Sequence, residues 1–192
     1  MRKIDRAPHG MGKFMPGQDL VVAGVIGKSG ARKAMETRSA ALTARFHPAF
    51  LDRLEKSANE TIGLTPDRME KLAVTEWEYV EEGGILAALW NISGAYEQGI
   101  SFSLLKIPVS QEIIEVCELL DLNPYRLWSG ECLLLVTDHG QDLVDRLTEQ
   151  KICAAVIGKV DQGIARKMTG VGQTGFLERP RIDEAEKLKE EE

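Results

Sequence analysis

The sequence predicts an α+β fold in which a mixed β-sheet is flanked by helices. Apolar, β-branched runs typical of strands alternate along the chain with stretches of strong helix formers. The long, evenly spaced crossovers of a doubly wound parallel sheet are missing, and the last two expected strands, 166–169 and 175–177, look like a hairpin. Because 192 residues fit one domain, we expect one folding unit.

The first part of this unit is expected to hold one strand and three helices. Residues 20–26 have the Val- and Ile-rich composition of a buried strand. Strong helix formers fill 31–46, and Pro48 separates them from a second helix at 49–58. A third, shorter helix should begin at Pro66, because Thr65 before it is a good cap.

In the middle of the chain, the sequence predicts two further strands, each followed by a helix. Residues 73–80 form the first strand, and Gly83-Gly84 opens an apolar helix that ends before Gly99. Residues 101–107 alternate well enough for the second strand, and Ser110 is placed to start the next helix.

The last part predicts a central strand at 131–137, because of its Leu-Leu-Leu-Val content. Asp138 with Gln141 has the spacing of a capping box for the following helix, which ends near residue 150. Residues 154–160 form the strand before the closing hairpin.

Composition excludes several classes of protein. The formal net charge is −6, which argues against a nucleic-acid binder. No apolar run is long enough to span a membrane and no signal peptide is evident, so we expect a cytoplasmic protein with no membrane partner. Cys117, Cys132 and Cys153 each have apolar neighbours, which favours buried, reduced thiols.

Several short runs resemble one known family. The runs are 17–22 (GQDLVV), 85–90 (ILAALW), 99–102 (GISF), 106–109 (KIPV), 123–125 (NPY), 154–160 (AAVIGKV) and 176–180 (FLERP). In this order and at these separations, they resemble the C-terminal domain of the aminoimidazole-ribotide-synthase-like (PurM-like) superfamily. Within that superfamily, the resemblance is greatest to hydrogenase maturation factors of the HypE type.

The resemblance implies a domain that shares an ATP site with a second domain. In complete members, a preceding N-terminal domain dimerises, carries acidic residues for Mg²⁺ and a Gly-rich segment, and binds ATP in a cleft between the two. The resemblance therefore divides this chain into an extended lead-in (1–17), the family domain (18–178) and a charged tail (179–192) that is expected to fray. Seventeen residues leave no room for the elements of phosphoryl transfer.

Two turns are candidate ligand-binding sites. Gly83 and Gly84 stand where the family usually has His-Asp-x-Thr-x-Gly-Gly, and backbone N–H groups at a helix start can hold a phosphate or carboxylate. Ser129 and Gly130 stand near a family Ser-Ser-Gly-Ser turn and are the second candidate. Close helix–strand packing is the alternative role for the first pair, and an ordinary turn is the alternative for the second.

Glu81 and Glu82 are candidates for holding Mg²⁺, although both would repel an anion at the neighbouring helix start. Lys28, in Gly27-Lys28-Ser29-Gly30, lacks the full spacing of a phosphate loop, so we interpret this stretch as a strand-to-helix turn. His9, His47 and His139 lack metal-ligand spacing and are expected at the surface. No catalytic residue is assigned. For the three tryptophans, Trp77, Trp90 and Trp128, the core is the default expectation and an interface is the alternative.

The C-terminal tail argues against one activity that the resemblance would imply, the dehydration to a nitrile. HypE-type enzymes end in Pro-Arg-Ile-Cys, whose cysteine carries the group that is dehydrated to a nitrile, whereas this chain has Asp183 after Pro180-Arg181-Ile182. A carboxylate cannot replace a thiolate acceptor. Our first hypothesis is a non-catalytic or partner-dependent relative, acting as a homodimer or docking onto a protein that supplies the N-terminal half. The alternative is an enzyme component that uses Mg-ATP or another phosphate ligand and needs a second chain to complete its cleft.

Overall fold

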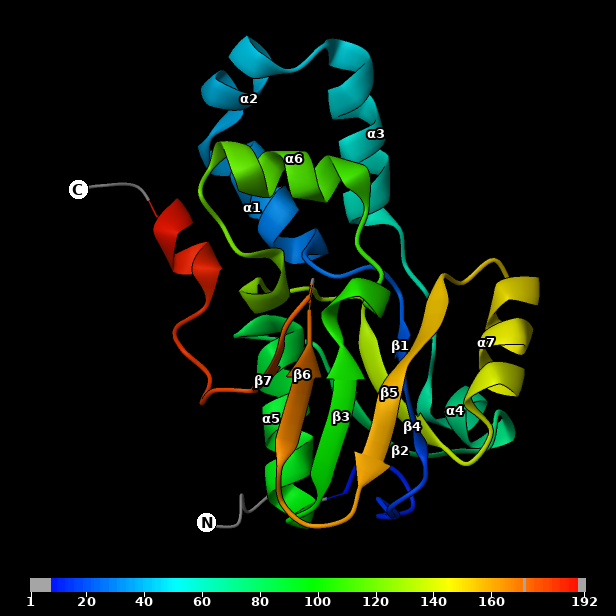
Figure 1. Cartoon of the computed structure of the whole chain (residues 1–192). Helices are drawn as coiled ribbons and strands as arrows, with labels where there is room; N and C mark the ends of the chain where they lie inside the picture. The colour runs from blue at the N-terminus through cyan, green and yellow to red at the C-terminus, as the bar shows by residue number, and fades with distance from the viewer. Residues whose placement is uncertain (1–7, 171, 190–192) are drawn as a thin grey trace.

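The computed structural model describes residues 8–170 and 172–189. Within them, one mixed sheet has the strand order β2-β4-β1-β5-β3-β6-β7. The strands are β1 (Asp19–Ala23), β2 (Val74–Tyr79), β3 (Gly99–Ser103), β4 (Leu133–Thr137), β5 (Ala154–Asp161), β6 (Arg166–Thr169) and β7 (Thr174–Phe176). Only β3 and β6 pair in parallel among these strands, and β6 and β7 form an antiparallel hairpin. The predicted mixed α+β fold is confirmed (Figure 1).

Helices lie on both faces of the sheet and at one end of it. They are α1 (Lys28–Thr37), α2 (Ser39–Arg45), α3 (Pro48–Asn59), α4 (Pro66–Lys71), α5 (Gly84–Tyr96), α6 (Gln111–Leu119) and α7 (Gly140–Glu149), with short 3₁₀ helices η1 (Leu104–Lys106), η2 (Pro124–Arg126) and η3 (Glu184–Leu188). Helix α5 covers one face, α4 and α7 cover the other, and α1, α2, α3 and α6 form a lobe beyond the strand ends (Figure 1).

The central position of β1 explains its unbroken apolar sequence. Leu20 and Val22 face α5, whereas Val21 and Ala23 face α4 and α7, so both faces of the strand are buried. Such burial requires continuous apolar residues in place of the alternation seen in a half-exposed strand. Strand β4 beside it is buried throughout for the same reason.

The predicted helix over 31–46 is wrong in one respect, because it is two helices. Helix α1 already begins at Lys28, and the backbone leaves the helical region at Arg38 (φ −126°, ψ 25°) before α2 starts. At this break, the Arg38 side chain points toward the C-terminal segment. Its guanidinium donates to the carbonyl oxygens of Lys187 and Lys189.

Two other predicted elements differ from the structure. The strand over 101–107 ends at Ser103, and the 3₁₀ turn η1 follows it, closed by the Ile107 N–H on the Leu104 carbonyl. The capping box of Asp138 is wrong because Asp138 bonds Lys13 and Gln18 instead. Helix α7 is capped from a distant part of the chain, by Asp19, whose carboxylate accepts the Gly140 N–H at 2.9 Å.

Both described ends of the chain lie against the body of the fold. Near the N-terminus, the Met11 N–H donates to the Thr75 carbonyl, and the fully buried Glu76 accepts from the His9 and Gly10 N–H groups. Near the C-terminus, the tail over 179–192 that was expected to fray contains η3 at Glu184–Leu188, and its residues 190–192 lie outside the described residues. The Leu188 side chain of η3 packs against the apolar face of α1 and is therefore buried in the core of the helical lobe.

The cysteine prediction is confirmed for Cys117 and Cys132, which are free and buried, and is wrong for Cys153, which is free but exposed. Burial raises the pKa of both buried thiols to about 12. In the described part of the chain, no helix has the length and apolar character needed to cross a membrane.

Candidate functional site

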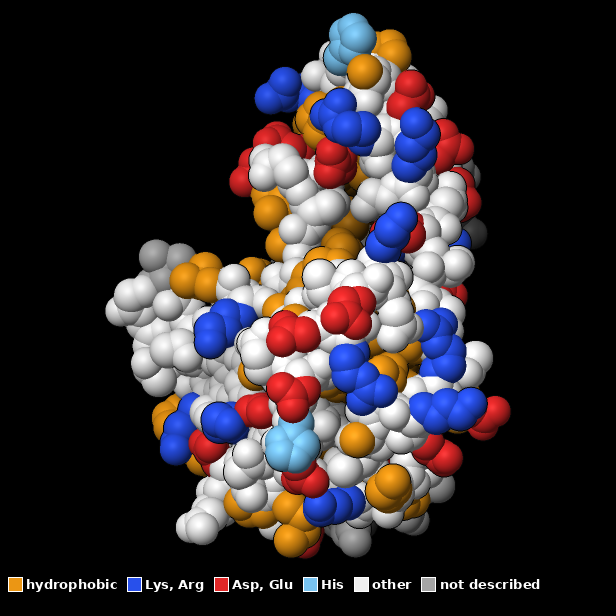
Figure 2. All heavy atoms as spheres, turned by 90° about the vertical axis from the view of Figure 1, so that its right-hand side faces the viewer, with side chains coloured by type: hydrophobic (Ala, Val, Ile, Leu, Met, Phe, Trp, Pro, Cys, Tyr) orange, Lys and Arg blue, Asp and Glu red, His pale blue; other side chains and the backbone are white. Residues whose placement is uncertain are grey.

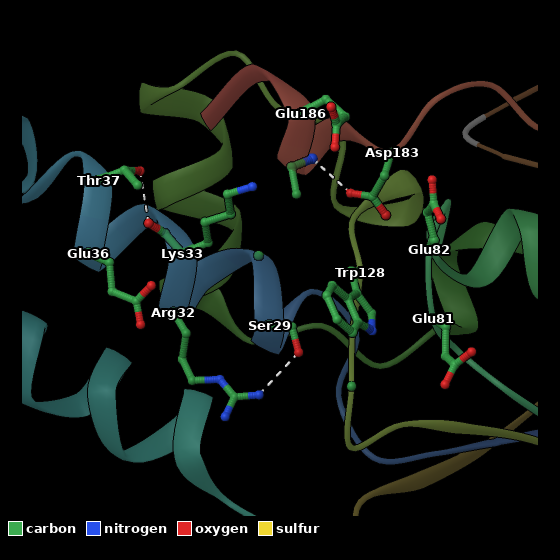
Figure 3. Close-up of a pocket in the computed structure, with 13 residues that line it drawn as sticks. Ser29, Arg32, Lys33, Glu36, Thr37, Glu81, Glu82, Trp128, Asp183 and Glu186 are labelled. Carbon is green, nitrogen blue, oxygen red and sulfur yellow. Dashed lines mark hydrogen bonds between the residues drawn. The ribbon is translucent and has the colours of Figure 1, made fainter. Parts of the chain in front are cut away.

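A hollow of about 850 Å³ lies between α1, the turns before β4 and α5, and the C-terminal segment. We call it the α1–α5 hollow. Its lining includes Glu81, Glu82 and Gly130, so the fold brings three of the sequence candidates together. Figure 3 shows the two glutamates on one side of this hollow and α1 on the other.

Gly83 marks the start of α5, and its N–H group is already bonded within the chain. The Asp183 carboxylate accepts this N–H at 2.6 Å with one oxygen and the Ala185 N–H at 2.7 Å with the other. Asp183 is only 5% exposed. A negative side chain therefore occupies the position at the helix start where an anionic ligand would be favoured.

Gly84 has the packing role that was the alternative for the glycine pair. Its φ is +67°, and a Cβ atom there would lie 2.6 Å from the Tyr125 carbonyl oxygen and 2.8 Å from the Leu127 nitrogen. Only glycine fits this close approach between α5 and η2 at a positive φ.

Ser129 is fully buried and does not line the α1–α5 hollow. Its hydroxyl accepts the Gly27 N–H at 2.8 Å and donates to the Leu127 carbonyl at 3.1 Å. Gly130, at φ +65°, does line the hollow and lies against Ser29. The Ser129 hydroxyl therefore ties the start of α1 to the turn before β4.

Charges of both signs face each other across the α1–α5 hollow. Arg32 and Lys33 project from α1, opposite Glu81 and Glu82, with Asp183 on the C-terminal segment (Figure 3). The Arg32 guanidinium donates to the Ser29 hydroxyl at 3.1 Å. Among the described residues, no group of three or more His, Cys, Asp or Glu side chains is arranged to hold a metal ion.

Trp128 forms the aromatic wall of the hollow, so the core, which was the default expectation for all three tryptophans, is wrong for this one. Trp77 is buried and Trp90 is partly buried, with the Arg166 guanidinium 4.0 Å from its ring centre, but Trp128 is 48% exposed. Its position directly before the Ser129-Gly130 turn was the available signal.

Lys28 makes hydrogen bonds within the chain, in agreement with the turn interpretation. Helix α1 begins at this residue, and its side chain is 1% exposed. The ammonium donates to the Glu60 carbonyl at 2.9 Å and contacts the Glu60 carboxylate at 3.3 Å. His9, His47 and His139 are exposed, as expected, and the His47 ring caps α3 by accepting the Ala49 N–H.

No protein-family model matches this chain, and a search of curated proteins finds no match. Solved structures do match. HypE in complex with ATP is 19% identical, with a TM-score of 0.70 over 93% of this chain and 55% of that one. HypE in a HypE–HypF complex is 20% identical, with a TM-score of 0.67 over 88% and 55%. Thiamine-monophosphate kinase from Stenotrophomonas maltophilia K279a is 18% identical, with a TM-score of 0.61 over 91% and 54%.

These likenesses show the fold. The chain shares the fold of the matched parts of HypE and thiamine-monophosphate kinase, and it spans about 55% of the length of the HypE structures that it matches.

Proposed function

We propose that this chain is a PurM-like domain that acts in assembly with another polypeptide, either a second copy or a different protein, and does not use ATP by itself. The observation that carries the proposal is the bond between Asp183 and the Gly83 N–H, at the start of α5. An incoming phosphate must displace a buried carboxylate there. It must also approach Glu81 and Glu82, which repel it.

The extent of the fold supports dependence on a partner. The chain matches about 55% of the HypE structures, so the remainder of such a fold would come from another polypeptide or from a longer form of this one. HypE itself is found in complex with HypF, which is a precedent for a protein partner on this fold. A role in hydrogenase maturation and a cytoplasmic location belong to the same proposal.

Trp128 is our candidate contact for the partner. It is a large, half-exposed aromatic at the wall of a hollow, and aromatic residues are enriched where protein surfaces meet. The matched comparison is Phe176 on β7, which is 68% exposed and does not line the hollow.

A second candidate function, binding of a phosphate ligand such as Mg-ATP, is favoured by the cations Arg32 and Lys33 in the same hollow. Glu81 and Glu82 would hold Mg²⁺ together with phosphate oxygens, because hard cations prefer oxygen ligands. The precedent is HypE bound to ATP. Under this alternative a second chain completes the cleft.

Thermal unfolding with and without excess Mg-ATP tests the choice, because a ligand that prefers the native state raises the unfolding temperature. We expect no saturable rise for the isolated chain. A saturable rise that is lost in Glu82→Gln would overturn the first proposal in favour of the second.

Light scattering over a range of protein concentrations tests whether the partner is a second copy of this chain. If the partner is a second copy, Trp128→Ser weakens the dimer and Phe176→Ser leaves it unchanged. A monomer at every concentration would exclude the second copy. Equal behaviour of the two variants in a dimer would exclude Trp128 as the contact.

A further inference from the structure

A second, smaller hollow of about 200 Å³ lies between α4 and α7 and shares no residue with the α1–α5 hollow. It is lined by Arg68, Lys71, Leu72, Arg146 and Gln150, and we call it the basic hollow. Figure 2 faces the side of the molecule that carries α4 and α7, where Lys and Arg side chains lie among Asp and Glu side chains.

Neutral oxygen atoms hold the two guanidinium groups of the basic hollow. Arg68 donates to the Gly63 carbonyl at 2.6 Å and to the Gln150 side-chain oxygen. Arg146 donates to the Lys71 carbonyl at 3.1 Å. Each guanidinium carries five N–H groups, so these bonds orient both side chains and leave further donors in place.

The positive charge of the basic hollow is not neutralised by side chains. None of its lining residues is acidic, and within residues 8–170 and 172–189 no carboxylate lies within 4.0 Å of the charged groups of Arg68, Lys71 or Arg146. Helices α4 and α7 both end here, at Leu72 and Gln150, and each end contributes about half a negative charge. Three cations against two such ends leave a net charge of about +2.

Stabilisation of the helix ends explains only part of this arrangement. The bond from Arg146 to the Lys71 carbonyl compensates the end of α4. In the described chain, the Lys71 ammonium donates no hydrogen bond, although this side chain lines the same hollow. The two helix ends together offset only about one of the three positive charges.

We propose that the basic hollow binds the phosphate group of a small phosphorylated ligand. Guanidinium groups match phosphate oxygens in pairs, and a lysine adds a mobile point charge. A net charge of about +2 suits a phosphate monoester, which carries nearly two negative charges at neutral pH. The site has only three cations in a chain of net charge −6, which does not suit a nucleic-acid backbone.

The test uses Lys71→Gln, with Lys56→Gln as the matched control. Both lysines are exposed, and each stands in the last turn of its helix, but Lys56 is on α3 and does not line the basic hollow. The probes are inorganic phosphate and glycerol 3-phosphate, each added at constant ionic strength set with sodium chloride. The readout is the rise in unfolding temperature as the probe saturates the protein.

We expect a saturable rise with both probes for the wild type and for Lys56→Gln. Lys71→Gln should need about tenfold more of either probe, since one charge-assisted hydrogen bond is lost at an exposed site. The proposal fails if phosphate acts no differently from chloride, or if the two variants have the same affinity. Binding of inorganic phosphate without glycerol 3-phosphate would also overturn it, because the ligand would then not be a phosphate ester.

Discussion

Substitution of Asp183 tests how the C-terminal segment is held. The Asp183 carboxylate joins this segment to the start of α5 through the Gly83 N–H and folds η3 through the Ala185 N–H. Asp183→Ala removes both bonds and leaves two buried N–H groups without this acceptor. We expect the segment over 184–189 to open more often, while the sheet stays folded.

The expected magnitude follows from these contacts. Two hydrogen bonds to a charged group contribute roughly 3–6 kcal/mol before the carboxylate regains its hydration, so a net loss of about 3 kcal/mol is reasonable. Burial of Leu188 contributes about 1.5–3 kcal/mol, and this anchor remains in the variant. A loss of about 3 kcal/mol makes local opening on the order of a hundredfold more frequent.

Hydrogen exchange followed by mass spectrometry measures this opening. Peptides that cover 184–189 should exchange faster in Asp183→Ala, whereas those of β1 and β4 should be unchanged. Asp183→Asn keeps one oxygen acceptor and should give an intermediate rate. Glu178→Ala is the control, because Glu178 is exposed and its ion pair is with Arg181, in the same segment.

Unchanged exchange over 184–189 in Asp183→Ala would refute this reasoning. The Asp183 carboxylate would then not hold the segment in place. The proposed function, which depends on this carboxylate occupying the start of α5, would lose its support.

Two further predictions concern packing and thiol chemistry. Gly84→Ala should lower the free energy of unfolding by about 3 kcal/mol in urea titrations, because the new Cβ overlaps the Tyr125 carbonyl at a positive φ. Gly163→Ala has a φ of +80° with no atom within 4 Å and should cost only about 1 kcal/mol; equal losses would contradict the packing role of Gly84. At pH 8 a thiol reagent should modify only Cys153 in the native protein, because Cys153 is exposed, whereas Cys117 and Cys132 are buried and burial raises the pKa of both to about 12. All three should react after unfolding, and a second native thiol that reacts would show that one of the buried pair is accessible.

Features that depend on neighbouring residues were predictable from the sequence. The continuous apolar run of β1 indicated a buried strand, and Ser110 does cap α6, where its hydroxyl accepts the Ile113 N–H. Pro66 begins α4, as the sequence indicated, and Pro48, which was expected just before the helix at 49–58, is the first residue of α3. These signals act within a few residues along the chain, so a single sequence carries them.

Features that depend on distant residues were not predictable. Helix α7 is capped by Asp19, which is 121 positions away, and Asp183 reaches Gly83 across 100 positions. No residue close to Asp138 in sequence indicates that its carboxylate accepts hydrogen bonds from Lys13 and Gln18 in place of forming the expected capping box. Such pairs exist only once the sheet has brought their strands together.

The candidate site was predictable in part for the same reason. Glu81, Glu82 and Gly130 do line one hollow, but the opposite side of that hollow is formed by α1 and depends on the position of this helix. Gly30 fixes this position, since a Cβ there would lie 2.1 Å from the Leu127 side chain. Arg32 and Lys33 therefore face the hollow because of a contact between residues 97 positions apart in sequence.

The central place of β1 also bears on how the chain folds as it is synthesised. Residues 19–23 pair with 133–137 and with 154–159, so this apolar strand leaves the ribosome long before either neighbour exists. At usual rates of translation the wait is on the order of ten seconds. During that interval Leu20 to Ala23 remain an exposed, aggregation-prone segment, so the yield of folded protein should depend on chaperones and on the speed of synthesis.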